Sequence, residues 1–345
     1  MDFLRNNVEN IMIVKRQEEL KLNHRAYLEA AALNGCIIVA SNCGDISIIN
    51  NQFDLVNELR FEDIKDLESL SASPVDDCFA ISDGHKLRII TFDGQILYES
   101  KECKQIQHAE YSRDGNHLWI VNRIDKENIL IELLDVKGGL QCMASVAMVD
   151  DYYDSNPMFF HLPEQDKILL WLAAGQDGQS LFMLEHDDDR ISVTELPQFE
   201  NFYPPLFSET GDYFITASID SYPVKIEKYA YPSLELLDSC EIETEQLDSI
   251  NPLSNPFALL SLYESNIIFD MDKMVALEPL VVEGYEYYED TYTVCIERVT
   301  QEEKVMVTDI SGIKKLGDKH IGVVRYSDSM KKGERKDKLV WFHMN

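Results

Sequence analysis

The segment YSRDGNHLWIVNR (residues 111–123) joins a polar turn to a strongly apolar run. Gly, Asn and Asp punctuate turns, and short runs of Ile, Val, Leu and aromatic residues are typical of buried strands. The same arrangement recurs in LNGCIIVASNCGDISIIN (33–50), SASPVDDCFAISDGHKLRIITFDG (71–94), LPEQDKILLWLAA (162–174), FSETGDYFITASID (207–220) and SNPFALLSLYESNIIFDM (254–271). These segments predict a chain of many short strands without long helices.

The turns of these segments recur at a regular distance. They fall near residues 35, 76, 114, 165, 211 and 255. A period of about 40 to 50 residues with about four strands per unit is typical of β-propeller blades. The most helix-like stretch, RAYLEAAAL (25–33), is still predicted as a strand, because Asn-Gly and a second apolar run follow it. We therefore expect an all-β fold, with a single β-propeller domain over residues 1–345.

Parts of the chain resemble a known family of repeats. SRDGNHLWIV (112–121) and SETGDYFITAS (208–218) look like the core of a WD-repeat blade, and DCFAISDGHKLRIITFDGQILYE (77–99) resembles the strands and turns that follow. This resemblance to a divergent WD-repeat-like β-propeller covers most of the chain. No blade opens with Gly-His or ends its third strand in Trp-Asp, so we expect apolar packing, without the family's Asp–His network, to hold the blades.

The two ends of the chain are expected to complete one blade. DKHIGVVRYS (318–327) and DKLVWFHM (337–344) read as strands of a last blade that lacks an outer strand, and ENIMIVKRQ (9–17) is an apolar strand without a blade. Pairing them closes the ring and removes open sheet edges. The prediction is seven four-stranded blades closed by the N-terminal strand, with residues 285–310 as an inserted hairpin. Six or eight blades are the alternatives.

The composition is strongly acidic. Asp and Glu number 62 against 31 Lys and Arg, for a formal net charge of −31. Such a surface repels nucleic acid and anionic lipid and attracts basic proteins, although acidity also serves solubility. We expect a protein partner with a basic surface, no nucleic acid or membrane partner, and a monomer on its own.

The cellular compartment of the protein is inferred from its N-terminal segment and from its cysteines. The N-terminal segment has no apolar core of the kind found in signal peptides. The seven cysteines are scattered without a Cys-x-x-Cys pair, and several lie within apolar runs. They read as buried thiols in a reducing compartment, so we expect a cytoplasmic protein.

No local motif for catalysis or cofactor binding is present in the sequence. None of the eight histidines pairs at the spacing of a metal-binding helix, and Ser, Zn and phosphate-loop motifs are absent. The run His186-Asp187-Asp188-Asp189-Arg190 lacks the Gly and the alternation of a calcium loop and reads as a solvated turn. We expect no catalytic residue, no cofactor and no metal.

Two clusters combine carboxylates with tyrosines. The first contains Asp150, Asp151, Tyr152, Tyr153 and Asp154. The second contains Tyr285, Glu286, Tyr287, Tyr288, Glu289, Asp290 and Tyr292. Tyrosine is enriched at protein interfaces, and flanking carboxylates favour Arg and Lys on a partner. Both clusters are expected in exposed loops at blade junctions and are the candidate partner-binding residues.

The function expected from these features is a non-enzymatic protein–protein interaction scaffold. A rigid ring holds its loops in place, so that little entropy is lost when a partner binds. One alternative is an immunity-type inhibitor of a basic toxin or nuclease. The other is a propeller hydrolase or lyase with a site at the central channel.

Overall fold

The computed structural model describes the backbone between residues 12 and 342 with gaps. Outside the described residues lie 1–11, 15, 22–25, 31–34, 42, 51, 53, 101–104, 152–154, 165, 175–177, 188, 220, 244–246, 254, 263–265, 283–285, 291–292, 300–303, 317–318, 329–334 and 343–345. Side chains are described from residue 35 to residue 277, apart from these gaps and residues 248 and 266. The chain forms two compact units, one of residues 27–204 and one of residues 205–345 with 1–26.

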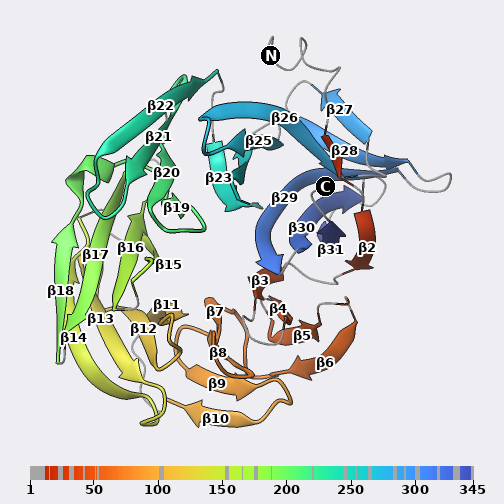
Figure 1. Cartoon of the computed structure of the whole chain (residues 1–345). Helices are drawn as coiled ribbons and strands as arrows, with labels where there is room; N and C mark the ends of the chain where they lie inside the picture. Colours follow the sequence, from red (N-terminus) through yellow and green to blue (C-terminus); the bar gives the residue numbers. More distant parts are fainter. Residues whose placement is uncertain are drawn as a thin grey trace. The chain divides into compact units, whose positions relative to one another are not determined.

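The unit of residues 27–204 contains four sheets of four strands, each with its strands in chain order (Figure 1). The first two sheets comprise β3 (Ala26–Ala30), β4 (Ile37–Ser41), β5 (Asp45–Ile49), β6 (Leu55–Arg60), β7 (Ser69–Ala72), β8 (Cys78–Ser82), β9 (Leu87–Thr91) and β10 (Ile96–Glu99). The next two comprise β11 (Gln105–Tyr111), β12 (His117–Arg123), β13 (Asn128–Asp135), β14 (Gln141–Val149), β15 (Asn156–His161), β16 (Lys167–Ala173), β17 (Gln179–Asp187) and β18 (Arg190–Glu195).

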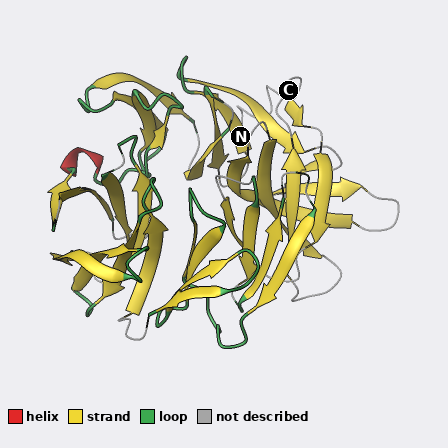
Figure 2. Cartoon of the chain, turned by 60° about the horizontal axis from the view of Figure 1, so that its bottom comes forward, coloured by secondary structure: helices red, strands yellow, loops and turns green. Residues whose placement is uncertain are grey.

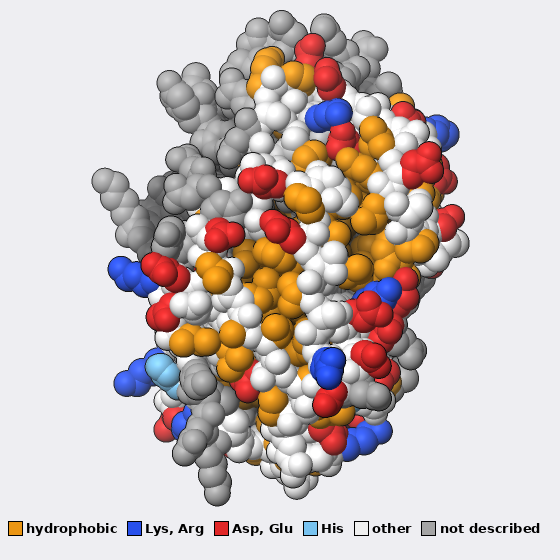
Figure 3. Space-filling model, turned by 90° about the vertical axis from the view of Figure 1, so that its left-hand side faces the viewer, with side chains coloured by type: hydrophobic (Ala, Val, Ile, Leu, Met, Phe, Trp, Pro, Cys, Tyr) orange, Lys and Arg blue, Asp and Glu red, His pale blue; other side chains and the backbone are white. Residues whose placement is uncertain are grey.

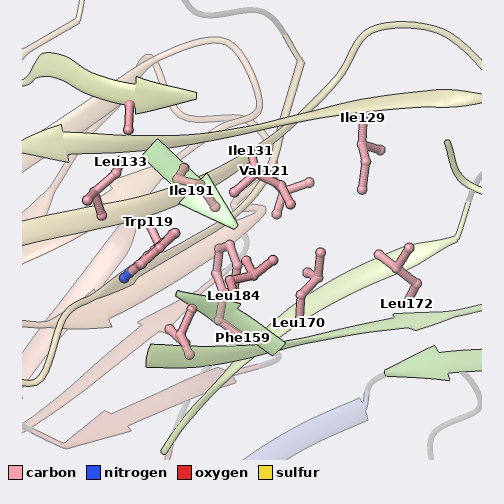
Figure 4. Packing of buried hydrophobic residues seen from close by; sticks show 12 residues of the cluster. Trp119, Val121, Ile129, Ile131, Leu133, Phe159, Leu170, Leu172, Leu184 and Ile191 are labelled. Atoms are coloured by element: carbon pink, nitrogen blue, oxygen red, sulfur yellow. The ribbon is translucent and has the colours of Figure 1, made fainter. Parts of the chain in front are cut away.

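Consecutive sheets of this unit share apolar clusters. The second strands β4 and β8 are buried along their whole length, as their apolar sequences predict. Figure 4 shows the cluster between the third and fourth sheets, where Trp119 and Leu133 face Phe159 and Leu184. Each such side chain contributes about 1.5–3 kcal/mol when fully buried.

The turn that opens the segment 111–123 depends on one glycine. Gly115 has φ +69°, a conformation that L side chains rarely adopt. A Cβ at this position would also collide with the side chain of Val75 in the preceding sheet. Glycine is therefore required here both for the turn and for the approach of two neighbouring sheets.

Hydrogen bonds from serines add to the apolar packing between sheets. The Ser69 hydroxyl donates to the Ala109 carbonyl at 3.0 Å and accepts from the Ala109 amide at 2.9 Å. The Ser71 hydroxyl accepts from the Tyr111 amide at 3.1 Å. These bonds join β7 to β11, so the expectation of apolar packing alone was incomplete.

The unit of residues 205–345 with 1–26 contains three sheets. One comprises β19 (Leu206–Phe207), β20 (Tyr213–Ala217), β21 (Val224–Ala230) and β22 (Leu236–Ile242). The next sheet comprises β23 (Leu247–Pro252), β24 (Phe257–Leu262), β25 (Asn266–Asp270), β26 (Val275–Val282) and β1 (Met12–Val14). The last sheet comprises β27 (Glu286–Asp290), β28 (Thr293–Val299), β29 (Lys304–Leu316), β30 (Lys319–Asp328), β31 (Arg335–Phe342) and β2 (Arg16–Lys21).

The N-terminal segment pairs differently from the sequence-based prediction. Residues 9–17 were expected to form one strand beside 337–344. Instead β2 pairs antiparallel with β31, from Arg16↔Phe342 to Lys21↔Lys338, and β1 pairs parallel with β26. The apolar pattern located residues that favour burial, whereas the polar strand Arg16–Lys21 that pairs with β31 has no such pattern.

The remaining expectations for the strands hold in a coarser form. Each of the six recurring segments lies in a different sheet, in chain order. Five sheets have four strands, whereas the other two have five and six. Within residues 285–310, β28 pairs with both β27 and β29, so these strands extend the last sheet.

Helical structure is minimal in the described residues. Figure 2 shows strands throughout and one short helix, the 3-10 turn η2 (Pro197–Phe199). Among the described residues, no helix has the length and apolar character needed to span a bilayer.

Candidate functional site

The first acidic cluster begins directly after β14, and a buried ion pair fixes its first residue, Asp150. Nη1 of Arg123, at the end of β12, donates to Oδ2 of Asp150 at 2.6 Å. The same Asp150 oxygen accepts from the Ser155 amide at 3.0 Å and from its hydroxyl at 2.8 Å. Nη2 of Arg123 donates to the Ser155 carbonyl at 2.8 Å. Arg123 thus holds both Asp150 and Ser155 in place.

Burial and hydrogen bonding act in opposite directions on Asp150. Its side chain is fully buried and that of Arg123 is 4% exposed. Burial acts to raise the pKa of the Asp150 carboxyl, but hydrogen bonds from Arg123 and Ser155 outweigh it and hold the pKa below its usual value. Asp150 is therefore an anion that Arg123 and Ser155 fully engage.

The structure corrects the role expected for Asp150. A buried carboxylate with three donors has no exposed surface, so the expectation that Asp150 lies exposed to a partner was wrong. Asp151, the next residue, is exposed as expected. Tyr152, Tyr153 and Asp154 lie outside the described residues.

Further carboxylates lie beside this loop. The Asp150 amide donates to the Glu127 carbonyl at 2.7 Å, which places the turn between β12 and β13 next to Asp151. In that turn Asp125, Lys126 and Glu127 are all exposed. The exposed end of this sheet therefore carries three carboxylates and one lysine.

The second cluster is mainly strand rather than loop. Glu286, Tyr287, Tyr288, Glu289 and Asp290 form β27, at one edge of the six-stranded sheet. The expectation of an exposed loop was wrong for these five residues, because they pair with β28 from Glu286↔Glu297 to Asp290↔Thr293. Tyr285 and Tyr292 lie outside the described residues, and the structure does not bring the two clusters together within one unit.

The remaining expectations from the sequence concern metal ligands, the acidic run 186–190 and the cysteines. Among the described residues, no three His, Cys, Asp or Glu side chains group as metal ligands. Asp187 ends β17, Arg190 begins β18 and Asp189 lies in the turn between them, and all three are exposed. The expectation of a solvated turn thus holds for Asp189, whereas His186, Asp187 and Arg190 belong to strands. Five cysteines are described as free thiols. Cys36 and Cys78 are buried, Cys240 is half-buried, and Cys43 and Cys142 are exposed, so burial was a wrong expectation for the last two.

Arg123 and Ser155 were missed by the sequence analysis. The available signal was the position of Arg123, a single cation that ends the apolar run LWIVN within the segment 111–123. A charge at the end of a buried strand needs a partner, and Asp150 follows the last strand of the same sheet. Sequence spacing alone does not single out this carboxylate among the neighbouring ones.

Comparisons with known proteins bear on the fold. No protein-family model and no curated protein matches the sequence. The structure is similar to the β-propeller domain of Cps50 (Swd1) from Myceliophteria thermophila, with a TM-score of 0.62 and 12% identity over 95% of this chain and 99% of that one. This chain has a β-propeller fold.

A second solved structure also has a similar fold. Hydrazine synthase of Kuenenia stuttgartiensis matches with a TM-score of 0.54 and 11% identity, over 71% of this chain and 76% of that one. At such identities the likeness concerns the fold alone. The function must therefore be argued from the residues of this chain.

Proposed function

We propose that this chain is a non-enzymatic protein-interaction scaffold that binds a basic protein surface through residues 151–154 and 285–292. The observation that carries the proposal is the set of hydrogen bonds that Arg123 donates to Asp150 and Ser155, which fixes the residue before Asp151 and the residue after position 154. Fixed residues beside a binding site reduce the conformational entropy that is lost when a partner binds. WD-repeat-like propellers commonly serve as such scaffolds.

The architecture proposed with this function is a closed ring of seven blades. Seven sheets support the number, and the pairing of β2 with β31 supports closure by the N-terminal strand. Closure leaves each blade held on both sides, so that the loops between strands keep fixed positions. A rigid ring of this kind is the physical basis for recognition by loops.

Charge supports a basic partner and a monomeric scaffold. A net charge of −31 repels a second copy, nucleic acid and anionic lipid, and it accelerates encounters with basic proteins. Asp125, Glu127 and Asp151 place negative charge beside the first cluster. Tyrosines at such a site would contribute apolar contact and cation–π interactions with Arg or Lys.

The proposal is tested by the salt dependence of association. A partner purified from the native host is mixed with the protein in stopped flow between low and physiological ionic strength. The association rate constant should fall steeply as salt rises, because screening shortens the field to about 8 Å at physiological salt. An Asp151→Asn/Glu127→Gln variant should associate more slowly at low salt, whereas Glu209→Gln, an exposed carboxylate in the other unit, should not. A salt-independent rate would contradict the proposal.

A further inference from the structure

Strand β14 differs in charge from the other outer strands of the described sheets. Its nine residues, QCMASVAMV (141–149), include no charged side chain and no proline. It is the last strand of the sheet β11-β12-β13-β14, so one of its edges pairs with no described strand. In a chain of net charge −31, a long uncharged edge strand is an exception.

The comparable outer strands all carry charges. β6 contains Glu58 and Arg60, β10 contains Glu99, β18 contains Arg190 and Glu195, and β22 contains Asp238 and Glu241. Charged residues on edge strands prevent unwanted pairing with other chains. β14 lacks this protection, so its edge is open to pairing with an added strand.

The hydrogen-bonding groups that face this edge follow from the register. The Asp150 amide donates to the Glu127 carbonyl, so these two residues form a hydrogen-bonded pair. Because such pairs alternate in an antiparallel ladder, the pairs of Val149, Ala147 and Ser145 with β13 are non-bonded. The backbone amides and carbonyls of these three residues therefore point toward the open edge.

The two faces of β14 make the strand a rigid template. Ala144, Val146 and Met148 pack into the cluster that joins the third and fourth sheets. The alternate residues are exposed, with Met143 at 39% and Val149 at 60%. Figure 3 shows the side of the molecule where the outer strands β14 and β18 lie in Figure 1, with apolar side chains among uncharged ones and carboxylates around them.

Charge at the end of the strand identifies the occupant. Val149 leads directly to Asp150 and the exposed Asp151, and the exposed Asp125 and Glu127 lie in the turn beside it. Lys126 is the one cation among these exposed neighbours. An incoming strand with basic residues at this end matches the carboxylates, whereas a second copy brings its own charge of −31.

We propose that the open edge of β14 binds an extended segment of a protein partner as an added antiparallel strand. The segment carries basic residues at its N-terminal end. Backbone hydrogen bonds to Ser145, Ala147 and Val149 supply affinity, and the carboxylates beside Val149 select Lys or Arg at the N-terminal end of the segment. The inference rests on the proposed protein-binding function and adds the element that binds and the conformation of the partner.

The test uses a synthetic peptide with the sequence Lys-Arg-Thr-Val-Thr-Val-Thr, labelled with a fluorophore, and measures anisotropy at low ionic strength. Ala147→Pro removes an outward amide without breaking the ladder to β13 and should weaken binding about tenfold or more. The matched control Ala147→Val keeps the amide and should bind within about twofold of the wild type. A peptide headed by Glu-Asp should bind about tenfold more weakly than the basic one.

A second arm keeps the wild-type protein and modifies the peptide. N-methylation of the alternate residues whose amides face β14 should abolish binding, whereas N-methylation of the other alternate residues should preserve it. Equal binding of both methylated peptides, or equal binding by Ala147→Pro and wild type, overturns the proposal. A wild-type dimer in sedimentation that Ala147→Pro dissociates would make a second copy the occupant and also overturn it.

The outcome is independent of the tyrosine clusters. The peptide assay is repeated on a variant that lacks Tyr152, Tyr153, Tyr287 and Tyr288, which should bind the peptide as the wild type does. Failure of the peptide to bind therefore contradicts pairing at β14 but not the proposed function. An association rate constant with the partner that does not change with salt contradicts the proposed function but not pairing at β14.

Discussion

Nη1 of Arg123 lies 2.6 Å from Oδ2 of Asp150, and neither side chain is more than 4% exposed. The pair connects the end of β12 to the loop that follows β14, and Ser155 completes it with two further hydrogen bonds to Asp150. Two residues separated by 27 positions thus fix the segment that leads to the first tyrosine cluster.

Loss of the Asp150 charge should destabilise the fold. Asp150→Ala leaves Arg123 buried without its carboxylate, and such uncompensated charges cost about 3–5 kcal/mol. The free energy of unfolding from urea titration measures the effect. Asp151→Ala is the matched control, because this neighbouring carboxylate is exposed, and it should change stability by less than about 0.5 kcal/mol. Equal effects of the two substitutions would contradict the structural role of Asp150.

The contribution of Asp150 should depend on pH in a defined direction. Its pKa is lower in the folded protein than in the unfolded chain, where it is about 3.9. The stabilisation is therefore fully present above about pH 4 and is lost as the pH falls through the lower folded pKa. The stability difference between wild type and Asp150→Asn, followed by urea titration, should shrink as the pH falls below about 4. A difference that grows toward acid pH would show the opposite shift.

Removal of the N-terminal strands should open the edges with which they pair. Deleting residues 1–21 removes β1 and β2 and leaves the edges of β26 and β31 unpaired. The melting temperature should fall by about 5 °C or more, and the protein should self-associate through the exposed edges. Deleting residues 1–11, which precede both strands, is the control and should change neither property. A shortened protein that stays monomeric with an unchanged melting temperature would contradict closure by β2.

Folding should require no metal. The sequence lacks ligands at metal-site spacing, and the described residues contain no group of three candidate ligands. Elemental analysis of the purified protein should find no stoichiometric metal, and its melting temperature should be the same with and without a chelator. A metal present at one equivalent, with a chelator-induced fall in melting temperature, would instead support the hydrolase or lyase alternative.

The strands were predictable because local signals agree with the fold. In the segment 111–123 the turn glycine and the apolar run predict β12, and Asn-Gly at 34–35 correctly separates β3 from β4. The stretch Glu286–Asp290 was expected to be a loop because it was placed at a blade junction, but it forms β27. Tyrosine favours strands, and pairing with β28 outweighs the charge of its neighbours.

Neither the contacts of Arg123 with Asp150 and Ser155 nor the open edge of β14 was predictable from local sequence patterns. Asp150 and Asp151 are identical residues in sequence, yet one is buried and the other exposed. Only the approach of Arg123 from another strand of the sheet distinguishes them. In the same way, the mainly apolar sequence of β14 is compatible with a strand, but its position at a sheet edge depends on topology.

The affinity of the purified partner for a tyrosine variant tests the central claim most directly. Tyr152→Ala, Tyr153→Ala, Tyr287→Ala and Tyr288→Ala are combined in one protein, and Tyr222→Ala, an exposed tyrosine outside both clusters, is the control. We predict that the combined variant dissociates faster and loses more than about 2 kcal/mol of binding free energy, while the control binds as the wild type does. Unchanged binding by the combined variant would contradict the assignment of both clusters as the partner site.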